Sequence, residues 1–323
     1  MNKLISVIIP SFNHANYIQD TINSIINQTY PNIELLIVDD GSTDSTLEKI
    51  KELEKKCLSR FTRFVIKTKK NSGVVDTLNE LISLSQGDYI AICASDDIYT
   101  PNALMLEYKE LEKDSSIALV VGNNKIIDKY GKECYWDNSR NNVYNKNEAV
   151  FLSFTDFISK VADIDFSSPE FGTYERLYLE NHIPNGYLIR KSIFNIIGNY
   201  TNLAPLEDYW LMLQISKYAK IKAINEDTFF YRWHGNNTIT QTEKMVQYNK
   251  KTRDFENLLL INIHSDKCLI NYLEFRKNRL LSLFSNEILN KSKIATLEFQ
   301  IKELKKTIWY KIGKIFYRNL RRI

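Results

Sequence analysis

The sequence predicts an α/β fold with a mostly parallel central sheet, followed by a C-terminal helical extension. The first observation is a series of short apolar runs, which are typical of strands buried on both faces. The second is that segments with apolar residues at helical spacing separate these runs, and this alternation implies parallel strand pairing. The third is size: 323 residues, 44% of them hydrophobic, suffice for an enzyme core and an accessory segment.

Each element is expected from its own local signal. Strands are expected at residues 4–9, 33–38, 63–67, 88–93 and 117–121. Between them, Ser45 and Glu48 have the spacing of a capping box that opens a helix, and Pro101 suits the first position of another helix. Residues 123–186 have weak periodicity and predict no clear elements. A helix over 206–218, a strand over 228–233 and a mostly helical segment from Met245 complete the pattern.

Composition narrows the cellular setting. The four cysteines lack the paired spacing of a zinc site or disulfide framework, which favours a reducing cytoplasm. No apolar run approaches the roughly 18 residues of a membrane-spanning helix. The apolar run near the N-terminus ends at Pro10, so we expect a buried strand there instead of a signal peptide.

Acidic pairs follow two of the expected strands. Asp39-Asp40 comes directly after residues 33–38, and Asp96-Asp97 closely follows residues 88–93. Ligands of such sheets bind beyond the carboxyl ends of the strands, where both pairs would lie. Carboxylates there can accept hydrogen bonds from a base or ribose, or hold a divalent cation that bridges phosphates. Either pair alone could be only a turn or a polar loop, but their shared position favours a ligand site.

Several motifs, in order, resemble glycosyltransferase family 2. They are SVIIPSFN at 6–13, LIVDDGSTD at 36–44, and GDYI at 87–90 leading to SDD at 95–97. Three later segments are similar to the family as well: NSG at 71–73, LEDYW at 206–210 and YRWHGNN at 231–237. The resemblance covers about residues 1–240. It implies the GT-A fold and a bacterial enzyme that inverts the anomeric configuration.

The resemblance also implies a nucleotide-sugar site. Asp40 would bind the nucleobase, with Pro10 and Phe12 lining its pocket, while Asp39 would mainly hold the turn. Further contacts with the nucleotide sugar are expected from three residues, Asn13, Asn71 and Gly73.

A metal site and a catalytic base follow from the same resemblance. Asp97 would be the direct ligand of Mn²⁺ or Mg²⁺, with Asp96 contacting ribose or metal, and His234 would bind the metal or the diphosphate. Asp208, beside Glu207, would deprotonate an acceptor hydroxyl. The alternatives are a structural histidine and an acidic first turn favoured by the helix dipole.

The expected organisation has two parts. Residues 1–240 would form the catalytic domain, with the nucleotide-sugar half at 1–120 and the acceptor half at 121–240. Residues 241–323 would form the helical extension, with a basic amphipathic tail at 294–323. Residues 301–323 carry eight Lys and Arg against one Glu, and their apolar residues recur at helical spacing. This composition favours an anionic membrane surface as partner. A helix packed on the catalytic domain or a short coiled-coil seam in a homodimer is the alternative.

These observations predict an inverting, metal-dependent glycosyltransferase. It would move a sugar, from UDP by analogy with the family, to a glycan or lipid-linked acceptor in bacterial surface polysaccharide synthesis. It would act in the cytoplasm, peripherally at the inner face of the plasma membrane. The alternative is a nucleotide-sugar-binding protein of the same fold without transferase activity. No GxGxxG motif supports a dinucleotide-dependent oxidoreductase, and no recognition motif supports a nucleic-acid partner.

Overall fold

The computed structural model describes residues 2–235 and 237–263 of the chain. The chain divides into two compact units, Met1–Arg253 and Asp254–Ile323. Every site discussed below lies in the first unit. The expected division at residue 240 stays a prediction, and the tail at 294–323 lies outside the described residues. Within the described part, no helix combines the length and apolar character needed to cross a membrane.

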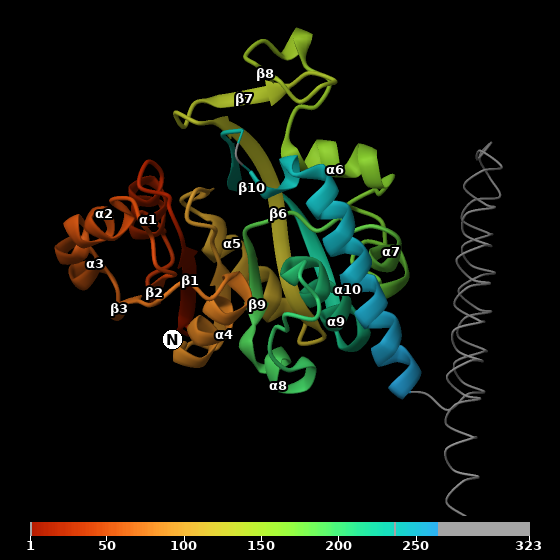
Figure 1. Cartoon of the computed structure of the whole chain (residues 1–323), viewed down its shortest axis with the longest axis horizontal. Coiled ribbons are helices and arrows are strands. Elements are labelled where there is room, and N and C mark those ends of the chain that lie inside the picture. Colours follow the sequence, from red (N-terminus) through yellow and green to blue (C-terminus); the bar gives the residue numbers. More distant parts are fainter. Residues whose placement is uncertain (1, 236, 264–323) are drawn as a thin grey trace, which may run out of the picture. The chain divides into compact units, whose positions relative to one another are not determined.

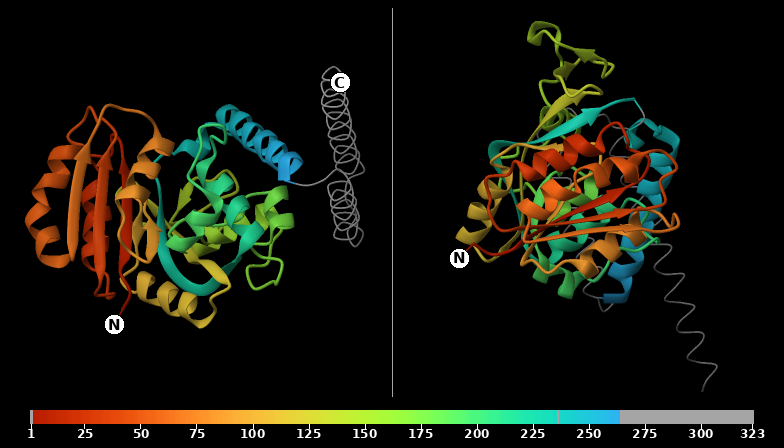
Figure 2. Two further views of the ribbon diagram at one scale, coloured as in Figure 1. Left: turned by 90° about the horizontal axis from the view of Figure 1, so that it is seen from below. Right: turned by 90° about the vertical axis from the view of Figure 1, so that its left-hand side faces the viewer.

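A ten-stranded sheet organises the described part of the chain (Figures 1 and 2). Along its main path the order is β3-β2-β1-β4-β9-β6-β10-β5, and β7 and β8 extend it from β6. The strands are β1 (Ile5–Ser11), β2 (Ile33–Asp39), β3 (Arg63–Thr68), β4 (Tyr89–Ile92), β5 (Ile98–Tyr99), β6 (Ile117–Asp128), β7 (Glu133–Trp136), β8 (Asn142–Val143), β9 (Tyr187–Arg190) and β10 (Lys220–Trp233).

Helices connect these strands and flank the sheet. The α-helices of the described part are α1 (Ile18–Ile26), α2 (Thr46–Glu52), α3 (Glu54–Arg60), α4 (Val74–Leu84), α5 (Ala103–Lys113), α6 (Phe154–Ala162), α7 (Tyr174–Leu179), α8 (Phe194–Ile197), α9 (Glu207–Tyr218) and α10 (Thr242–Ile263). Three short 3₁₀ helices are η1 (Lys146–Glu148), η2 (Lys191–Ile193) and η3 (Thr238–Thr240).

The first strands are buried because both of their faces are covered. Alternate residues of β1, Ile5, Val7 and Ile9, belong to a core cluster with apolar residues of α1, α2, α3 and α5. Successive strand residues point to opposite faces, so Ser6 and Ile8 face the other side, where α4 contacts β1 and β2. Continuous apolar runs such as that of β1 are therefore required, as the sequence predicted for a sheet buried on both sides.

Strand β9 separates the two parallel parts of the sheet. β3, β2, β1 and β4 pair in parallel, and β6 pairs in parallel with β10. β9 lies between β4 and β6 and is antiparallel to both. The segment that leads into β9 therefore enters at the edge where β1, β2 and β4 end. The predicted α/β fold with a mostly parallel sheet is confirmed, and β9 is an addition to it.

Some local predictions were wrong. The Ser45 side chain makes no capping hydrogen bond; instead the Asp44 carboxylate accepts the N–H of Thr46 at 3.0 Å. We expected one helix from Ser45 to about residue 56. The structure has two, α2 and α3, because the helix is interrupted at Leu53. α5 begins at Ala103, so Pro101 precedes the helix instead of opening it. β6 and β10 both extend beyond the predicted strands, because they pair with each other through register shifts that break the simple alternation.

We expect Gly186→Ala to destabilise the fold. Gly186 has φ of +70°, and an added Cβ would lie 2.2 Å from Cδ2 of the buried Phe229. The left-handed conformation costs alanine about 1–2 kcal/mol, and overpacking adds about 1–3 kcal/mol. Gly198→Ala is the control for backbone conformation alone, because Gly198 has φ of +78° and ψ of −169°, which strongly favour glycine, and has open space around it. Urea unfolding should show a loss of about 1–3 kcal/mol for the control and a larger loss for Gly186→Ala; equal losses would contradict the packing argument.

Candidate active site

Asn13 ties together the loops that follow β1 and β2. Its backbone N–H donates to Ser42 Oγ at 2.9 Å, and its Oδ1 accepts the backbone N–H of Thr43 at 2.8 Å. Asn13 has φ of 53°, a conformation that Asn tolerates better than most residues. Beside it, Pro10 is half-buried and Phe12 is 44% exposed. An apolar ring is therefore available at this edge for the predicted nucleobase pocket.

Asp40 holds the loop that carries Asn71 and Gly73. Its carboxylate accepts the backbone N–H of Ser72 at 2.9 Å and of Gly73 at 2.8 Å, and Lys69 Nζ lies 3.4 Å away. Asp40 is buried, whereas Asn71 and Gly73 are exposed. A carboxylate offers about four lone-pair positions, so Asp40 can accept a further donor such as a base N–H. Its contact with the nucleobase stays a prediction.

Asp39 stabilises the turn after β2. Its carboxylate accepts the backbone N–H of Ser42 at 3.1 Å, and it also hydrogen-bonds the hydroxyls of Ser42 and Thr68. Gly41 in this turn has φ of +76°, and a Cβ there would lie 2.8 Å from the backbone nitrogen of Asn71. The turn thus requires glycine, and it brings the loops of Asp39 and Asn71 together. These are contacts of a residue that holds a turn; a nucleotide contact of Asp39 stays a prediction.

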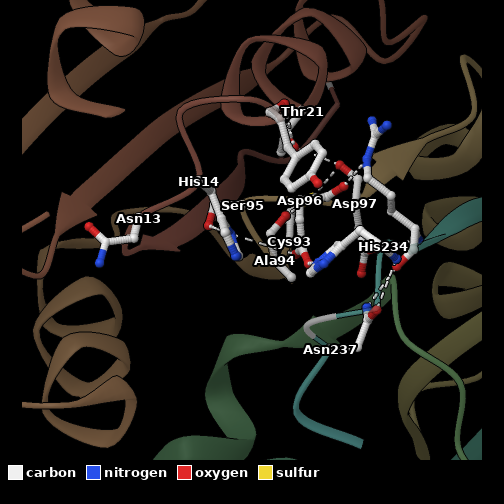
Figure 3. A network of polar contacts seen from close by, with 12 residues as sticks. Asn13, His14, Thr21, Cys93, Ala94, Ser95, Asp96, Asp97, His234 and Asn237 are labelled. Carbon is white, nitrogen blue, oxygen red and sulfur yellow. Dashed lines mark hydrogen bonds and ion pairs between the residues drawn. The ribbon is translucent and has the colours of Figure 1, made fainter. Parts of the chain in front are cut away.

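Asp96 lies between two histidines after the end of β4 (Figure 3). His234 Nε2 lies 2.9 Å from Asp96 Oδ2, and His14 Nδ1 lies 3.9 Å from Asp96 Oδ1. One ligand atom from each of the three residues lies within 4.8 Å of the others. The three residues come from the loops after β1 and β4 and from the end of β10. Two imidazoles and a carboxylate form a donor set that fits a divalent cation.

The adjacent Asp97 faces the protein interior. Its Oδ1 accepts the backbone N–H of Arg232 at 2.8 Å, and its backbone oxygen accepts the Thr21 hydroxyl at 2.8 Å. The side chain of Asn185 also acts on the Asp97 carboxyl group and lowers its pKa, against the larger effect of burial. These contacts use Asp97 to hold β10 and the chain before β9 against the loop that carries Asp96.

The pKa values of the two aspartates are shifted in opposite directions. Burial, and then the charge of Asp96, raise the pKa of Asp97 well above its ordinary value. For Asp96 burial acts in the same direction, but the hydrogen bond from His234 and the charge of His14 outweigh it, and the pKa is lowered. Asp96 is therefore the ionised carboxylate beside the imidazoles. The direct metal contact expected of Asp97 stays a prediction that this arrangement does not favour.

The fully buried Arg232 fixes the position of His234. Its Nε donates to the backbone oxygen of Asp96 at 2.7 Å, and its guanidinium pairs with Asp20 at 3.0 Å. The guanidinium also lies over the Tyr17 ring at 5.0 Å, and the Tyr17 ring stacks on the His234 ring with centroids 5.0 Å apart. The imidazole is thus held from the side of α1, in the same region as Asp96.

The acidic pair Glu207-Asp208 forms the first turn of α9. Asp208 accepts the backbone N–H of Tyr209 at 2.6 Å and the side-chain N–H of Asn181 at 3.3 Å. Burial raises the pKa of Asp208, and burial together with the charge of Asp208 raises the pKa of Glu207 to about 7. These upward shifts exceed the stabilisation of negative charge that a helix N-terminus provides. A carboxylate with a raised pKa is a stronger proton acceptor near neutral pH.

The segment before β9 connects this pair with the metal-site loop. Asn181 binds Asp208, and Asn185 binds Asp97. Tyr187, the first residue of β9, is buried, and its pKa is raised by burial and then by the charges of Asp208 and Glu207. One short segment therefore contacts both acidic groups, which lie more than one hundred residues apart in the sequence.

The sequence analysis missed several residues of this site. They are His14, Tyr17, Asp20 and Asn181, and no spacing pattern marks them, although His14 directly follows the first motif.

Comparison with known proteins identifies the family. A profile described as Glycosyl transferase family 2 matches residues 6–168. The chain belongs to this family.

Relatives agree with the family assignment. The glycosyltransferase GlyG of Streptococcus pneumoniae is 30% identical over 236 residues, which cover 72% of this chain and 71% of GlyG. The hyaluronan synthase of Pasteurella multocida is 28% identical over 322 residues, which cover 98% of this chain and 29% of the synthase. A chondroitin synthase of the same species is 30% identical over 237 residues, covering 73% of this chain and 21% of that protein. The chain thus spans less than a third of the length of either synthase.

A solved structure shares the fold of this family 2 member. TarS 1–349 of S. aureus, in complex with UDP-GlcNAc, aligns with a TM-score of 0.57 at 16% identity. The alignment covers 90% of this chain and 77% of the TarS chain. At this identity the likeness concerns the fold alone, and it confirms the predicted GT-A fold.

We expect Glu207→Gln to flatten the pH dependence of stability. Folding raises the pKa of Glu207 from 4.5 to about 7, so the folded state holds a proton that the unfolded state releases. The free energy of unfolding of the wild type therefore falls as pH rises through this window, by on the order of 1–3 kcal/mol more than that of the variant. Urea unfolding between about pH 4.5 and 7.5 measures the difference. The exposed Glu148→Gln should keep the wild-type slope; an unchanged slope in Glu207→Gln would refute the shift.

Proposed function

We propose that this protein is an inverting glycosyltransferase that moves a sugar from a nucleotide diphosphate, UDP in the first instance, to an acceptor hydroxyl. The observation that carries the proposal is the pairing of two acidic groups through one segment. Asp96 lies with its histidines, and in the segment before β9 Asn181 hydrogen-bonds Asp208 of α9 while Asn185 acts on Asp97, next to Asp96. The first group suits a diphosphate and its cation, and the second suits a proton acceptor.

The donor would bind along the edge formed by β1, β2 and β4. Asp40 would accept a base N–H while its loop amides keep the carboxylate oriented. The exposed Phe12 ring would cover the base, and Asn71 and Gly73 lie on the loop that Asp40 anchors. Because these loops are already ordered, donor binding loses less conformational entropy.

A divalent cation, Mn²⁺ or Mg²⁺, would be held by Asp96 and His234. When bound, such an ion supplies positive charge that stabilises the departing diphosphate. The chain's own residues prepare the site: Tyr17 orients the His234 ring, and the backbone of Asp96 is fixed by Arg232. Asp97 contributes by keeping β10 in place, since its carboxyl group accepts the Arg232 N–H.

Asp208 would accept the proton of the acceptor hydroxyl. The acceptor oxygen forms a bond to the anomeric carbon as the bond from that carbon to the diphosphate oxygen breaks, and the electron pair leaves with the nucleotide diphosphate. Attack from the face opposite the leaving group inverts the configuration. Asn181 orients the Asp208 carboxylate, and burial raises its pKa, which strengthens it as a base.

The names of the relatives support a glycan or a lipid-linked saccharide as acceptor. Hyaluronan and chondroitin synthases of Pasteurella multocida build polysaccharides by name, and TarS was solved with UDP-GlcNAc. We therefore propose a role in bacterial surface polysaccharide synthesis, with a UDP-sugar as donor.

We expect Asp208→Asn to abolish turnover without abolishing donor binding. A thermal-shift screen of nucleotide sugars with Mn²⁺ would first identify the donor. Hydrolysis or transfer of that donor should then fall about 10²–10⁴-fold in Asp208→Asn, the usual contribution of a general base. The donor dissociation constant should stay within about threefold. The exposed Asp165→Asn is the control and should retain wild-type rates.

Two outcomes would contradict this function. If the wild type binds a nucleotide sugar but turns over none of it with any acceptor or metal, the protein is a binding protein of the same fold. If Asp208→Asn retains wild-type turnover, the base lies elsewhere.

We also propose peripheral attachment to the inner face of the plasma membrane through residues 301–323. The support is their composition, eight basic residues with apolar residues at helical spacing. Deleting residues 301–323 should remove cosedimentation with anionic vesicles and leave sedimentation with neutral vesicles unchanged. Unaltered binding to anionic vesicles would refute the attachment, and a change from dimer to monomer instead would assign the segment to self-association.

A further inference from the structure

We propose that His14 is the third protein ligand of the cation site, and that the resulting two-imidazole, one-carboxylate set selects Mn²⁺ over Mg²⁺. The inference rests on the proposed cation-dependent function, and it adds a residue and an ion preference to it. His14 lies in the loop after β1, outside the motifs that predicted metal ligands.

Geometry supports ligation by His14. Its ligand atom and those of Asp96 and His234 lie within 4.8 Å of one another (Figure 3). Two protein ligands about 2.1 Å from one ion can be at most about 4.2 Å apart. A separation of 4.8 Å between two of these ligand atoms would therefore need to shorten by about 0.6 Å, which side-chain rotation can supply. The His14 side chain is 28% exposed, so the site stays open to a diphosphate on this side.

The position of His14 is fixed on three sides. Its backbone N–H donates to Thr46 Oγ1 at 2.9 Å, and its backbone oxygen accepts the N–H groups of Tyr17 and Ile18, both at 2.9 Å. The ring Nδ1 lies 2.7 Å from the hydroxyl of the buried Ser95. This Nδ1 is also the His14 atom that lies 3.9 Å from Asp96 Oδ1, so the contact with Ser95 holds the ring beside Asp96. Ser95 thus acts as a positioning residue for His14.

The donor set decides between the two ions. Mg²⁺ prefers oxygen ligands in near-ideal octahedral geometry and dehydrates reluctantly. Imidazole nitrogen binds first-row transition ions more strongly, and Mn²⁺ accepts both nitrogen and carboxylate oxygen. With Asp96 alone supplying charge among the three ligands, a site of two nitrogens and one carboxylate favours Mn²⁺.

The test measures metal binding directly. The electron paramagnetic resonance signal of free Mn²⁺ would be titrated with the full-length protein, with and without UDP, and Mg²⁺ would compete. His14→Gln should weaken Mn²⁺ binding at least tenfold while changing Mg²⁺ binding less than about threefold. His14→Asp restores an oxygen ligand and should bring the Mn²⁺ to Mg²⁺ preference toward unity. Ser95→Ala should weaken Mn²⁺ binding about tenfold without changing the preference for Mn²⁺.

The outcomes separate ligation from a structural role. Unchanged Mn²⁺ affinity in His14→Gln, or equal losses for both ions with no change of preference in His14→Asp, would overturn the proposal. Circular dichroism melts and UDP binding without metal identify a variant that has failed to fold, and Ser95→Ala then carries the test. A wild type that binds Mn²⁺ through His14 yet transfers no sugar would refute only the proposed function. Transfer in Mn²⁺ with no His14 dependence of Mn²⁺ binding would refute only this inference.

Discussion

The buried guanidinium of Arg232 is the interaction on which the candidate site depends. It joins the end of β10 to the loop after β4 through the backbone oxygen of Asp96, and to α1 through Asp20 and Tyr17. The guanidinium is buried, so losing these partners would leave a charge that water does not reach, and this connection therefore favours a single arrangement. The arrangement places His234, two residues after Arg232, against Asp96.

A second connection brings the later half of the chain to the same edge. β9 is antiparallel to both β4 and β6, so the residues that precede it arrive where the parallel strands end. Asn185 then contacts Asp97, and Asn181 contacts Asp208. This path requires glycine at position 186, where φ is +70° and a Cβ would lie 2.2 Å from Phe229. The pair Asp96-Asp97 and the pair Glu207-Asp208 are therefore connected through one segment. The pKa of Asp96 is lowered, whereas those of Glu207 and Asp208 are raised, which suits one group to cation binding and the other to proton removal.

The parts of the fold that sequence could predict are those whose burial is uniform. β1 and β2 are mostly apolar and buried along nearly their whole length, and they were expected within two residues of their bounds. β9 has four residues inside a polar segment, so no periodicity distinguishes it. The helix start was predicted correctly, since Ser45 is the N-cap of α2, but its side chain makes no capping hydrogen bond, and the neighbouring Asp44 carboxylate accepts the N–H of Thr46.

The candidate site was predictable to the level of motifs but not of individual contacts. Motif spacing identified the Asp96-Asp97 pair. It carries no information on which carboxylate faces the histidines, because that depends on burial and on the contact with Arg232. His14 gave no signal because its partners, Ser95 and Asp96, are some eighty residues away in sequence. The first part of the helical extension that the sequence predicted is α10, whereas the basic tail at 294–323 lies outside the described residues.

In the proposed function, Asp96 and His234 form the cation site that faces the donor diphosphate. Crystals grown with Mn²⁺ and UDP, measured at the manganese absorption edge, test it directly. We expect an anomalous peak about 2.0–2.3 Å from Asp96 Oδ and from a ring nitrogen of His234, in contact with a phosphate oxygen. A peak bound elsewhere, or a diphosphate placed away from the edge of β1, β2 and β4, would contradict it.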